Sequence, residues 1–448
     1  MDLGTRSIGK DFISKYFVIL MGVISISLYY FFNNSNIVLY YGILLNIIII
    51  IRVKNSRVLQ IVFLFMLTYL LNLVPYFSYG IHISYYSLYQ KEKIFESVLI
   101  IHVIFLILLY AFMKKDVNSN KEALINKVAM KDNGLVYASA IGVMSLILLL
   151  GKTGHNLSKT VSQTSQVTDG FAINEYFLIF TFIAYVFTGN LRSRKAIILI
   201  LSALYIVKNT LAEGRIETLQ LLILLFILFI DTKKINNALF WFGSIAGYLT
   251  MSLFEKLRIS SNGLINLFKT GQDGSPYIES NQGDVFYNSA VYVGLIKDQI
   301  FNYHFRINSF IGFVERIFLP SKYATSQANV SIFSKAYAQS GGGGLISIYF
   351  YVWLSYLGIV LIALILAFLV NKLYKTNNQY AVIYFVMFIC TVPRWFAYDP
   401  ITLFKLSSYA IVIFFCFNQL DIVLNKNKKK LTPYVQNQRK IIINQELR

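Results

Sequence analysis

The chain alternates long apolar stretches with short polar ones along most of its length. Twelve stretches are apolar enough for membrane spans, because a helix needs about 20 apolar residues to cross a hydrocarbon core of about 30 Å. They lie near residues 12–32, 37–51, 58–80, 94–113, 134–151, 173–189, 196–212, 216–230, 238–255, 345–370, 380–396 and 401–420. The second and the eighth are short, which also fits re-entrant or steeply packed segments. The pattern predicts an all-α, polytopic integral membrane protein with about 12 transmembrane helices in a single domain, residues 1–448.

Composition supports this class of protein. Hydrophobic residues make up 56% of the chain and charged residues only 14%, which is more apolar surface than one or two soluble cores could bury. Cys390 and Cys416 both lie in predicted spans, so the sequence predicts neither a disulfide framework nor a cysteine metal motif. The first apolar run is too long for a signal peptide and has no small-residue cleavage site, which indicates an uncleaved span.

The positive charges indicate which polar segments face the cytoplasm. Of the 41 lysines and arginines, 25 fall in seven segments that share one side if the N-terminus is cytoplasmic: 1–15, 52–57, 114–133, 190–195, 231–234, 371–379 and 421–448. This is the positive-inside pattern, and it predicts that both termini are cytoplasmic. The net charge of +20 and the basic tail 421–448 would also fit a protein that binds nucleic acid, but attraction to an anionic inner leaflet explains the tail as well. We therefore expect membrane lipids, and no nucleic acid, as partners.

The longest predicted external loop covers residues 256–344. A loop of this length in a compact protein is usually functional or disordered. Within it, 308–320 has a helical apolar face, a capping Asn308 or Ser309 at its start and Pro320 at its end; the face consists of Phe310, Ile311, Val314, Ile317 and Phe318. Glu315 and Arg316 are expected on the opposite side. This pattern fits a helix lying in the membrane interface and, equally, a helix packed over the bundle.

Several common catalytic chemistries have no motif in this chain. The sequence has no Walker loop, GxGxxG, HExxH, GxSxG or DxD motif, and its four histidines are scattered. We therefore expect no metal and no cofactor. His102, inside an apolar run, is more typical of a packing residue than of a catalyst. The lack of an internal repeat makes a transporter less favoured.

The predicted external side carries a set of cations suited to phosphate. They are Arg215, Lys256, Arg258, Arg306, Arg316 and Arg394. The planar fork of arginine binds phosphate bidentately and stabilises negative charge. For Arg306 or Arg316 taken alone, a lipid-headgroup anchor or a structural ion pair is the better interpretation. Arg215 differs, because Glu213 and Glu217 crowd it in a turn of minimal length.

A glycine run precedes the predicted tenth span. In "SGGGG" (340–344), Gly342 and Gly343 would let an anion approach the free N–H groups at the helix start. A flexible hinge is the alternative interpretation of the same glycines.

Three parts of the second half of the chain resemble the Wzy-type oligosaccharide repeat-unit polymerases, which extend O-antigen and related surface glycans. They are "AEGRIET" (212–218), the stretch 315–360 that contains the glycine run, and Arg394 of "VPRWFAYDP" (392–400). Family members typically carry an arginine at the first and third places and a Gly-rich helix start in the second. Many also place an acidic residue in the helix after the glycines, where this chain reads "LISIYFYVW" (345–353).

The resemblance implies a GT-C-like glycosyltransferase of the bacterial inner membrane with its active site on the periplasmic side. The donor would be a growing glycan on undecaprenyl diphosphate and the acceptor a single repeat unit on the same carrier. Attack by the acceptor hydroxyl would expel the lipid diphosphate in one inverting, metal-independent step. A separate protein that regulates chain length is a further partner that the resemblance suggests.

This reaction assigns roles to the candidate residues. The departing diphosphate needs preorganised positive charge, which we assign to Arg215 and Arg394 with Lys256 and Arg258 in support. Arg306, Arg316, Gly342 and Gly343 complete the predicted diphosphate-binding set. A general base must lie within hydrogen-bond reach of the acceptor hydroxyl, and the candidates, which the sequence does not rank, are Glu217, Asp284, His304 and Glu315.

Two other functions fit parts of the pattern. An O-antigen ligase would use the same donor but a lipid A core as acceptor, and only the resemblance of the glycine region favours the polymerase. A lipid-linked oligosaccharide flippase or other transporter should place charges deep in several spans. Here the charges collect at the outer ends of the spans and in one loop, which disfavours a flippase.

Overall fold

The computed structural model divides the chain into two compact units. Unit 1 contains Met1–Lys127 and Leu225–Lys405, and unit 2 contains Val128–Leu224 and Leu406–Arg448. The single membrane domain expected from the sequence stays a prediction. The structure describes residues 3–84, 86, 89, 92–114, 128, 130–151, 173–211, 215–230, 235–247, 269–270, 276–278, 280–320, 323–326, 328–338, 343–372, 375–395 and 399–446.

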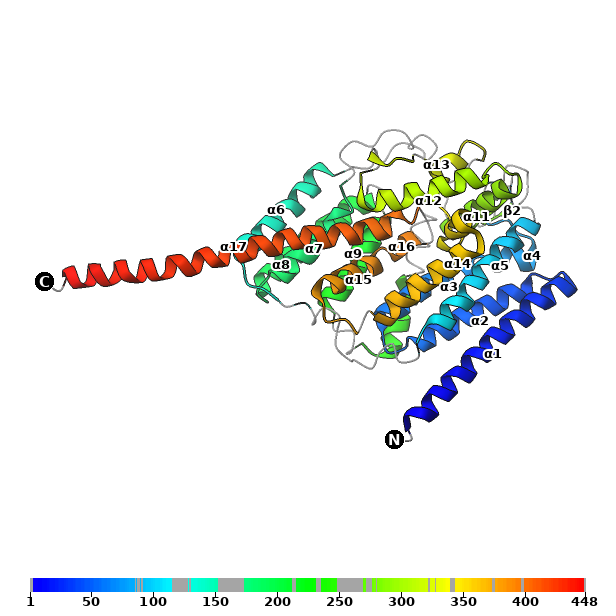
Figure 1. Cartoon of the computed structure of the whole chain (residues 1–448), viewed down its shortest axis with the longest axis horizontal. Helices are drawn as coiled ribbons and strands as arrows, with labels where there is room; N and C mark the ends of the chain where they lie inside the picture. The colour runs from blue at the N-terminus through cyan, green and yellow to red at the C-terminus, as the bar shows by residue number, and fades with distance from the viewer. Residues whose placement is uncertain are drawn as a thin grey trace. The chain divides into compact units, whose positions relative to one another are not determined.

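Helices provide nearly all of the regular structure (Figure 1). Those of unit 1 are α1 (Leu3–Phe32), α2 (Asn36–Arg52), α3 (Arg57–Leu71), α4 (Val74–Tyr79), α5 (Glu92–Phe112), α11 (Asn281–Lys297), α12 (Tyr303–Phe318), α13 (Val330–Ser334), α14 (Ile346–Lys372), α15 (Gln379–Cys390) and α16 (Val392–Trp395). Residues 237–247 are helical as well. The strands β1 (Lys269–Thr270) and β2 (Pro276–Tyr277) form one short antiparallel pair. For the described residues the predicted helical fold class is confirmed.

Among the residues that the structure describes, six helical stretches are long and apolar enough to cross a membrane. They are Lys15–Phe32, Ser35–Arg52, Arg57–Tyr79, Lys93–Phe112, Ile346–Lys372 and Ile401–Asn425. Four shorter apolar helices, at Gly134–Leu150, Tyr176–Val186, Ile216–Phe229 and Gln379–Cys390, match further predicted segments. The second predicted segment is thus long enough to span. These apolar helices fit a polytopic membrane protein, while the number of twelve spans stays a prediction.

The exposed surface of these helices is apolar, as contact with lipid requires. On α1, Phe17 and Leu20 are more than half exposed, and on α14 so are Leu357 and Phe368. An ordinary water-soluble protein rarely exposes contiguous apolar surface of this kind. The exposure therefore supports the membrane class independently of helix length.

The core of unit 1 is built around α5. This helix packs against α1, α2, α11 and α14, and its side chains are apolar on nearly every side, as expected for a helix enclosed by others. His102, in the middle of α5, is buried, and its Nδ1 lies 3.1 Å from the Ser347 Oγ on α14. The packing interpretation of His102 is thus confirmed.

Helix α11 lies inside unit 1 although its sequence belongs to the predicted external loop. It packs on α3, α5, α13 and α14 (Figure 1), and its residues from Val285 to Leu295 are all buried. Ser280 begins the helix by accepting a hydrogen bond of 2.9 Å from the Gly283 N–H. Part of the 256–344 segment therefore contributes to the core rather than covering it.

Gly283 marks a close approach between α11 and the segment before α5. A Cβ added there would lie 1.9 Å from the Ile83 carbonyl oxygen. We expect Gly283→Ala to lower the free energy of unfolding by about 1–3 kcal/mol, since neither backbone can move away freely. Thermal unfolding of the purified protein in detergent measures this. Gly142→Ala is the matched control, because a Cβ there meets nothing within 4 Å and alanine favours a helix; an equal loss in both variants would contradict the expectation.

Helix α14 is interrupted at Leu354 and Ser355, whose backbone angles are not helical. Arg306 on α12 occupies the break: its Nε donates to the Val352 carbonyl oxygen, and its Nη2 donates to the Tyr351 carbonyl oxygen at 3.2 Å and the Ser355 Oγ at 2.6 Å. The Trp353 Nε1 donates to the Ser309 Oγ at 3.1 Å. Helix α12 thus satisfies polar groups that the break would otherwise leave unpaired.

The prediction for 308–320 is partly wrong. Helix α12 begins at Tyr303, because Asn302 caps it by accepting a 2.9 Å hydrogen bond from the Phe305 N–H. The predicted apolar face is split: Ile317 is buried, whereas Ile311, Val314 and Phe318 are exposed. Arg316, expected on the opposite side, is buried. The register differs because α12 packs on α14 through Arg306, Ser309 and Phe313.

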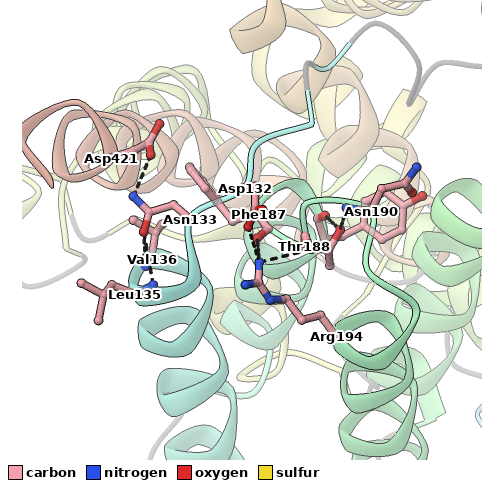
Figure 2. Close-up of polar contacts among 10 residues, drawn as sticks. Asp132, Asn133, Leu135, Val136, Phe187, Thr188, Asn190, Arg194 and Asp421 are labelled. Carbon is pink, nitrogen blue, oxygen red and sulfur yellow. Dashed lines mark hydrogen bonds and ion pairs between the residues drawn. The ribbon is translucent and has the colours of Figure 1, made fainter. Parts of the chain in front are cut away.

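Unit 2 contains α6 (Gly134–Leu150), α7 (Tyr176–Val186), α8 (Arg192–Leu211), the start of α9 (Arg215–Phe229) and most of α17 (Ile401–Glu446). Helices α6, α7 and α8 pack against one another. Figure 2 shows a network of polar contacts at one end of this unit, where Asn133 caps α6 and also donates a 2.8 Å hydrogen bond to the Asp421 Oδ1 on α17.

The same network includes two ion pairs. Lys131 lies 3.2 Å from the Asp421 carboxylate, and the Arg194 Nη1 lies 2.8 Å from the Asp132 carboxylate (Figure 2 draws the second pair). Arg194 also donates to the carbonyl oxygens of Phe187 and Thr188 just after α7. The network thus brings together residues of three segments that the charge pattern assigns to one side: Lys131, Asp132 and Asn133, then Arg194, and Asp421.

Candidate functional site

A polar cluster joins five segments of unit 1. We call it the Asp399 cluster; its members are Tyr292 on α11, Arg316 on α12, Asn329 and Ser331 at α13, Tyr349 on α14, and Asp399 just before α17. Two of the three family-like segments, 315–360 and 392–400, meet in it. The sequence did not predict that these residues lie together.

Asp399 is held in place by two hydrogen bonds. Its Oδ2 accepts from the Asn329 Nδ2 at 2.8 Å, and its Oδ1 accepts from the Ile401 N–H at 3.1 Å, at the start of α17. The residue is partly exposed. The surrounding protein raises the pKa of the Asp399 carboxyl, although the Ile401 N–H, Arg316 and Asn329 act in the opposite direction.

Arg316 brings a buried positive charge to the cluster. Its Nε donates to the Gly312 carbonyl oxygen at 2.7 Å and its Nη2 to the Ala328 carbonyl oxygen at 3.0 Å. These bonds fix the segment before α13 against α12. The charge acts on Asp399, so Arg316 stabilises the ionised form of that carboxyl.

Hydroxyl groups form the inner side of the cluster. The hydroxyl oxygens of Tyr292 and Tyr349 lie 3.2 Å apart, and the Tyr349 hydroxyl also contacts the Ser331 Oγ. Both tyrosines are fully buried. Burial raises the pKa of Tyr292 to about 12, so this hydroxyl stays protonated and does not compete with Asp399 as a base.

Arg394 belongs to the same short segment as Asp399. It lies on α16 and is partly exposed, while the neighbouring Trp395 is buried. The Trp395 indole packs at a tilt against Phe388, with ring centroids 4.9 Å apart, and its Nε1 donates to the Phe388 carbonyl oxygen at 3.3 Å. The buried tryptophan anchors α16, and the adjacent Arg394 is partly exposed with its Nε buried.

Two of the predicted diphosphate ligands, Arg306 and Arg316, form hydrogen bonds within the protein. Arg306 binds the break in α14, and Arg316 binds two backbone carbonyls. Their partners are backbone carbonyl oxygens and, for Arg306, also the Ser355 Oγ, rather than the acidic side chain of an ion pair. Binding of diphosphate by either of them stays a prediction.

The predicted general bases lie apart from one another. Glu315 accepts from the Thr325 N–H at 2.7 Å, and bonds from Thr325 hold the pKa of its carboxyl below the usual range. Asp284 accepts a 2.6 Å bond from the Ser84 Oγ. His304 is exposed, with its Nε2 2.9 Å from the Asn308 Nδ2. Glu217, on α9, is half-buried in unit 2.

The glycines at the start of α14 pack against α11. Gly343 and Gly344 are buried, and a Cβ on Gly344 would lie 2.6 Å from the Tyr292 ring. The Leu345 N–H donates to the Ser289 Oγ at 2.8 Å. A side chain of α11 therefore satisfies one of the N–H groups that the sequence offered to an anion, and Gly342 lies outside the described residues.

The remaining predicted ligands of the diphosphate are placed as follows. Arg215 begins α9 in unit 2, with its side chain outside the described part, and Lys256 and Arg258 lie in a stretch that the structure does not describe. Near the α8–α9 turn, Lys208 donates to the Leu148 carbonyl oxygen at 2.6 Å.

Within the described ranges, no group of three or more His, Cys, Asp or Glu residues could hold a metal ion. The comparisons with known proteins give no neighbour: no family model matches the chain, and neither a curated protein nor a solved structure does. The family resemblance therefore rests on the residues quoted from the sequence.

Sequence reasoning missed Asp399 and Asn329. The Asp-Pro pair at 399–400 is a recognisable signal for a turn and a helix start. Asn329, whose side chain donates to Asp399, is 70 positions away, so this pairing appears only in the fold.

Proposed function

We propose that this protein is a glycan polymerase that joins lipid-linked repeat units. The observation that carries the proposal is the meeting of residues 315–360 and 392–400 at the Asp399–Asn329 hydrogen bond. Both segments resemble the repeat-unit polymerases, and this contact makes them parts of one polar surface next to apolar helices.

The reaction joins a growing glycan on undecaprenyl diphosphate to a lipid-linked repeat unit. The terminal hydroxyl oxygen of the acceptor bonds to the anomeric carbon of the donor, and the bond from that carbon to the diphosphate breaks. The electron pair leaves with the diphosphate, whose growing charge is the part of the transition state that a cation stabilises best. In this proposal Arg394 of unit 1 supplies this charge, and the role assigned to Arg215 from the sequence stays a prediction.

In this proposal the chain lies in a bacterial inner membrane with both termini in the cytoplasm. The contacts at the two ends of α6 support this orientation. Asn133 and the basic segments assigned to the cytoplasm lie at its first residue, and Lys208 lies at the other end, beside Leu148. Reaction takes place at the periplasmic side, where the acceptor arrives on its lipid carrier.

Reconstitution of the purified protein into vesicles with the lipid-linked repeat unit alone tests the proposal. We expect a ladder of glycans that differ by one repeat, formed without added nucleotide, metal ion or second protein. Chelator should leave the ladder unchanged. Absence of any product longer than one repeat would contradict the proposal.

A deletion strain separates the polymerase from its rivals. Loss of a polymerase leaves single repeats on the lipid core, whereas loss of a ligase or a flippase leaves none. Bare core in the deletion strain would therefore favour one of the other two functions.

A further inference from the structure

The carboxylate of Asp399 is held by two hydrogen bonds and is partly exposed. Among the described residues each of its oxygens accepts one hydrogen bond, from Asn329 and from Ile401. A carboxylate has about four acceptor positions. Because Asp399 is also partly exposed, positions remain for a hydroxyl that arrives from outside the cluster.

The setting of Asp399 suits proton transfer. Its carboxyl has a raised pKa, caused mainly by burial, and a base works best when its pKa approaches the working pH. Glu315 lacks this property, because bonds from Thr325 and Ser326 lower the pKa of its carboxyl. Burial thus favours Asp399 as a base over Glu315.

The groups around Asp399 keep it usable as a base. Arg316 on α12 favours the ionised form, and the charge of Asp399 in turn acts on the buried hydroxyls of Tyr292 and Tyr349 on α11 and α14. Lys405 on α17 lies near Arg316 and donates to the Leu319 carbonyl oxygen at 3.2 Å. The raised pKa means that the Asp399 carboxylate accepts a proton more readily than that of an ordinary exposed aspartate.

We infer that Asp399 is the catalytic base that takes the proton from the acceptor's sugar hydroxyl, with Asn329 and Arg316 as the residues that position it. The inference rests on the proposed polymerase function. In the step, the hydroxyl oxygen forms its bond to the anomeric carbon, its proton passes to an Asp399 carboxylate oxygen, and the lipid diphosphate leaves with the electron pair of the broken bond. The proton then returns to water.

The test uses Asp399→Asn in the full-length protein with the lipid-linked repeat unit. Asparagine keeps the oxygen that accepts from the Ile401 N–H and caps a helix as well as aspartate, so the start of α17 is preserved, while the base and the hydrogen bond from the Asn329 Nδ2 are lost. We expect the initial rate of polymer formation to fall about 100- to 10,000-fold, with only the small fall in melting temperature that the loss of one hydrogen bond causes. Asp399→Glu, which keeps a carboxylate, should recover part of the rate.

The pH profile gives a second readout. The base acts only when ionised, so the wild-type rate should fall as the pH drops through the raised pKa of Asp399. This acid limb should be absent from the residual activity of Asp399→Asn. A wild-type rate for Asp399→Asn, or an acid limb that persists in it, would show that Asp399 only caps α17.

Folding failure and functional failure are distinguished in the same assay. If Asp399→Asn does not fold, Asp399→Ser replaces it in the assay, because serine also caps a helix. The same loss of polymerisation rate is expected. A wild-type protein that forms no polymer would overturn the polymerase proposal and this inference together. A wild-type ladder with full activity in the folded Asp399 variants would overturn this inference alone.

Discussion

Replacing Arg394 by alanine is expected to lower the rate of glycan polymerisation about 100- to 1,000-fold. That range is the usual cost of removing one preorganised donor to a developing negative charge. Arg394 is partly exposed, with its Nε buried, next to the buried Trp395, and the substitution leaves this tryptophan anchor of α16 in place. The initial rate of ladder formation in reconstituted vesicles measures the loss.

Lysine at the same position separates charge from geometry. If the guanidinium binds the diphosphate through both of its arms, Arg394→Lys should also lose most of the activity, since lysine offers one point charge. Arg192→Ala is the matched control, because this arginine is exposed at the start of α8 and belongs to no predicted site. Normal ladders from Arg394→Ala, or an equal loss from Arg192→Ala, would refute the assignment.

The Arg215 variants form the second arm of the same experiment. Arg215→Ala and Arg215→Lys are expected to insert into the membrane normally and to lose chain growth. Wild-type ladders from Arg215→Ala would refute the role in diphosphate binding that the sequence predicts for this arginine.

The apolar helices were predictable because apolarity alone defines a span. Each of the twelve predicted apolar segments overlaps a helix in the described residues, but the sequence did not locate α11 within the core. The residues of α11 carry no helical apolar stripe, since polar ones such as Asn288 and Ser289 are buried too. Only contact with α5 and α14 makes such a sequence a core helix.

The break in α14 was also beyond sequence reasoning. No proline lies at Leu354 or Ser355, and the apolar run continues through both. The break is stabilised by Arg306, which lies 45 and more positions earlier on another helix. A kink that depends on a partner from a distant element leaves no local signal.

The candidate site was also predictable only where the signal is local in the sequence. The importance of Arg394 was predictable from its residue type and its place between two apolar runs. The sequence could not rank the general bases, because a carboxyl becomes a good base through its surroundings. Asn329 and Arg316 reach Asp399 only through the packing of α12 and α13 on α14.

Alanine in place of Asp421 is expected to be the most destabilising change in unit 2. Asp421 is 5% exposed and accepts hydrogen bonds from Asn133 and Asn425, besides its pairing with Lys131. Its loss leaves these donors without their acceptor, which costs about 3–5 kcal/mol for a fully buried pair. The Lys131 side chain is 24% exposed, so solvent reduces the expected loss to about 1–3 kcal/mol.

The neighbouring ion pair supplies the control, because the same network contains an exposed carboxylate. Asp132 pairs with Arg194 at 2.8 Å but its side chain is 66% exposed, so Asp132→Asn should cost at most about 1 kcal/mol. Thermal unfolding in detergent of both variants, and of Asp421→Ala combined with Lys131→Ala, gives the comparison. The double variant should lose less than the sum of the two single ones, since the pairing is lost only once. Equal losses from Asp421→Ala and Asp132→Asn would mean that burial does not determine the strength of this network.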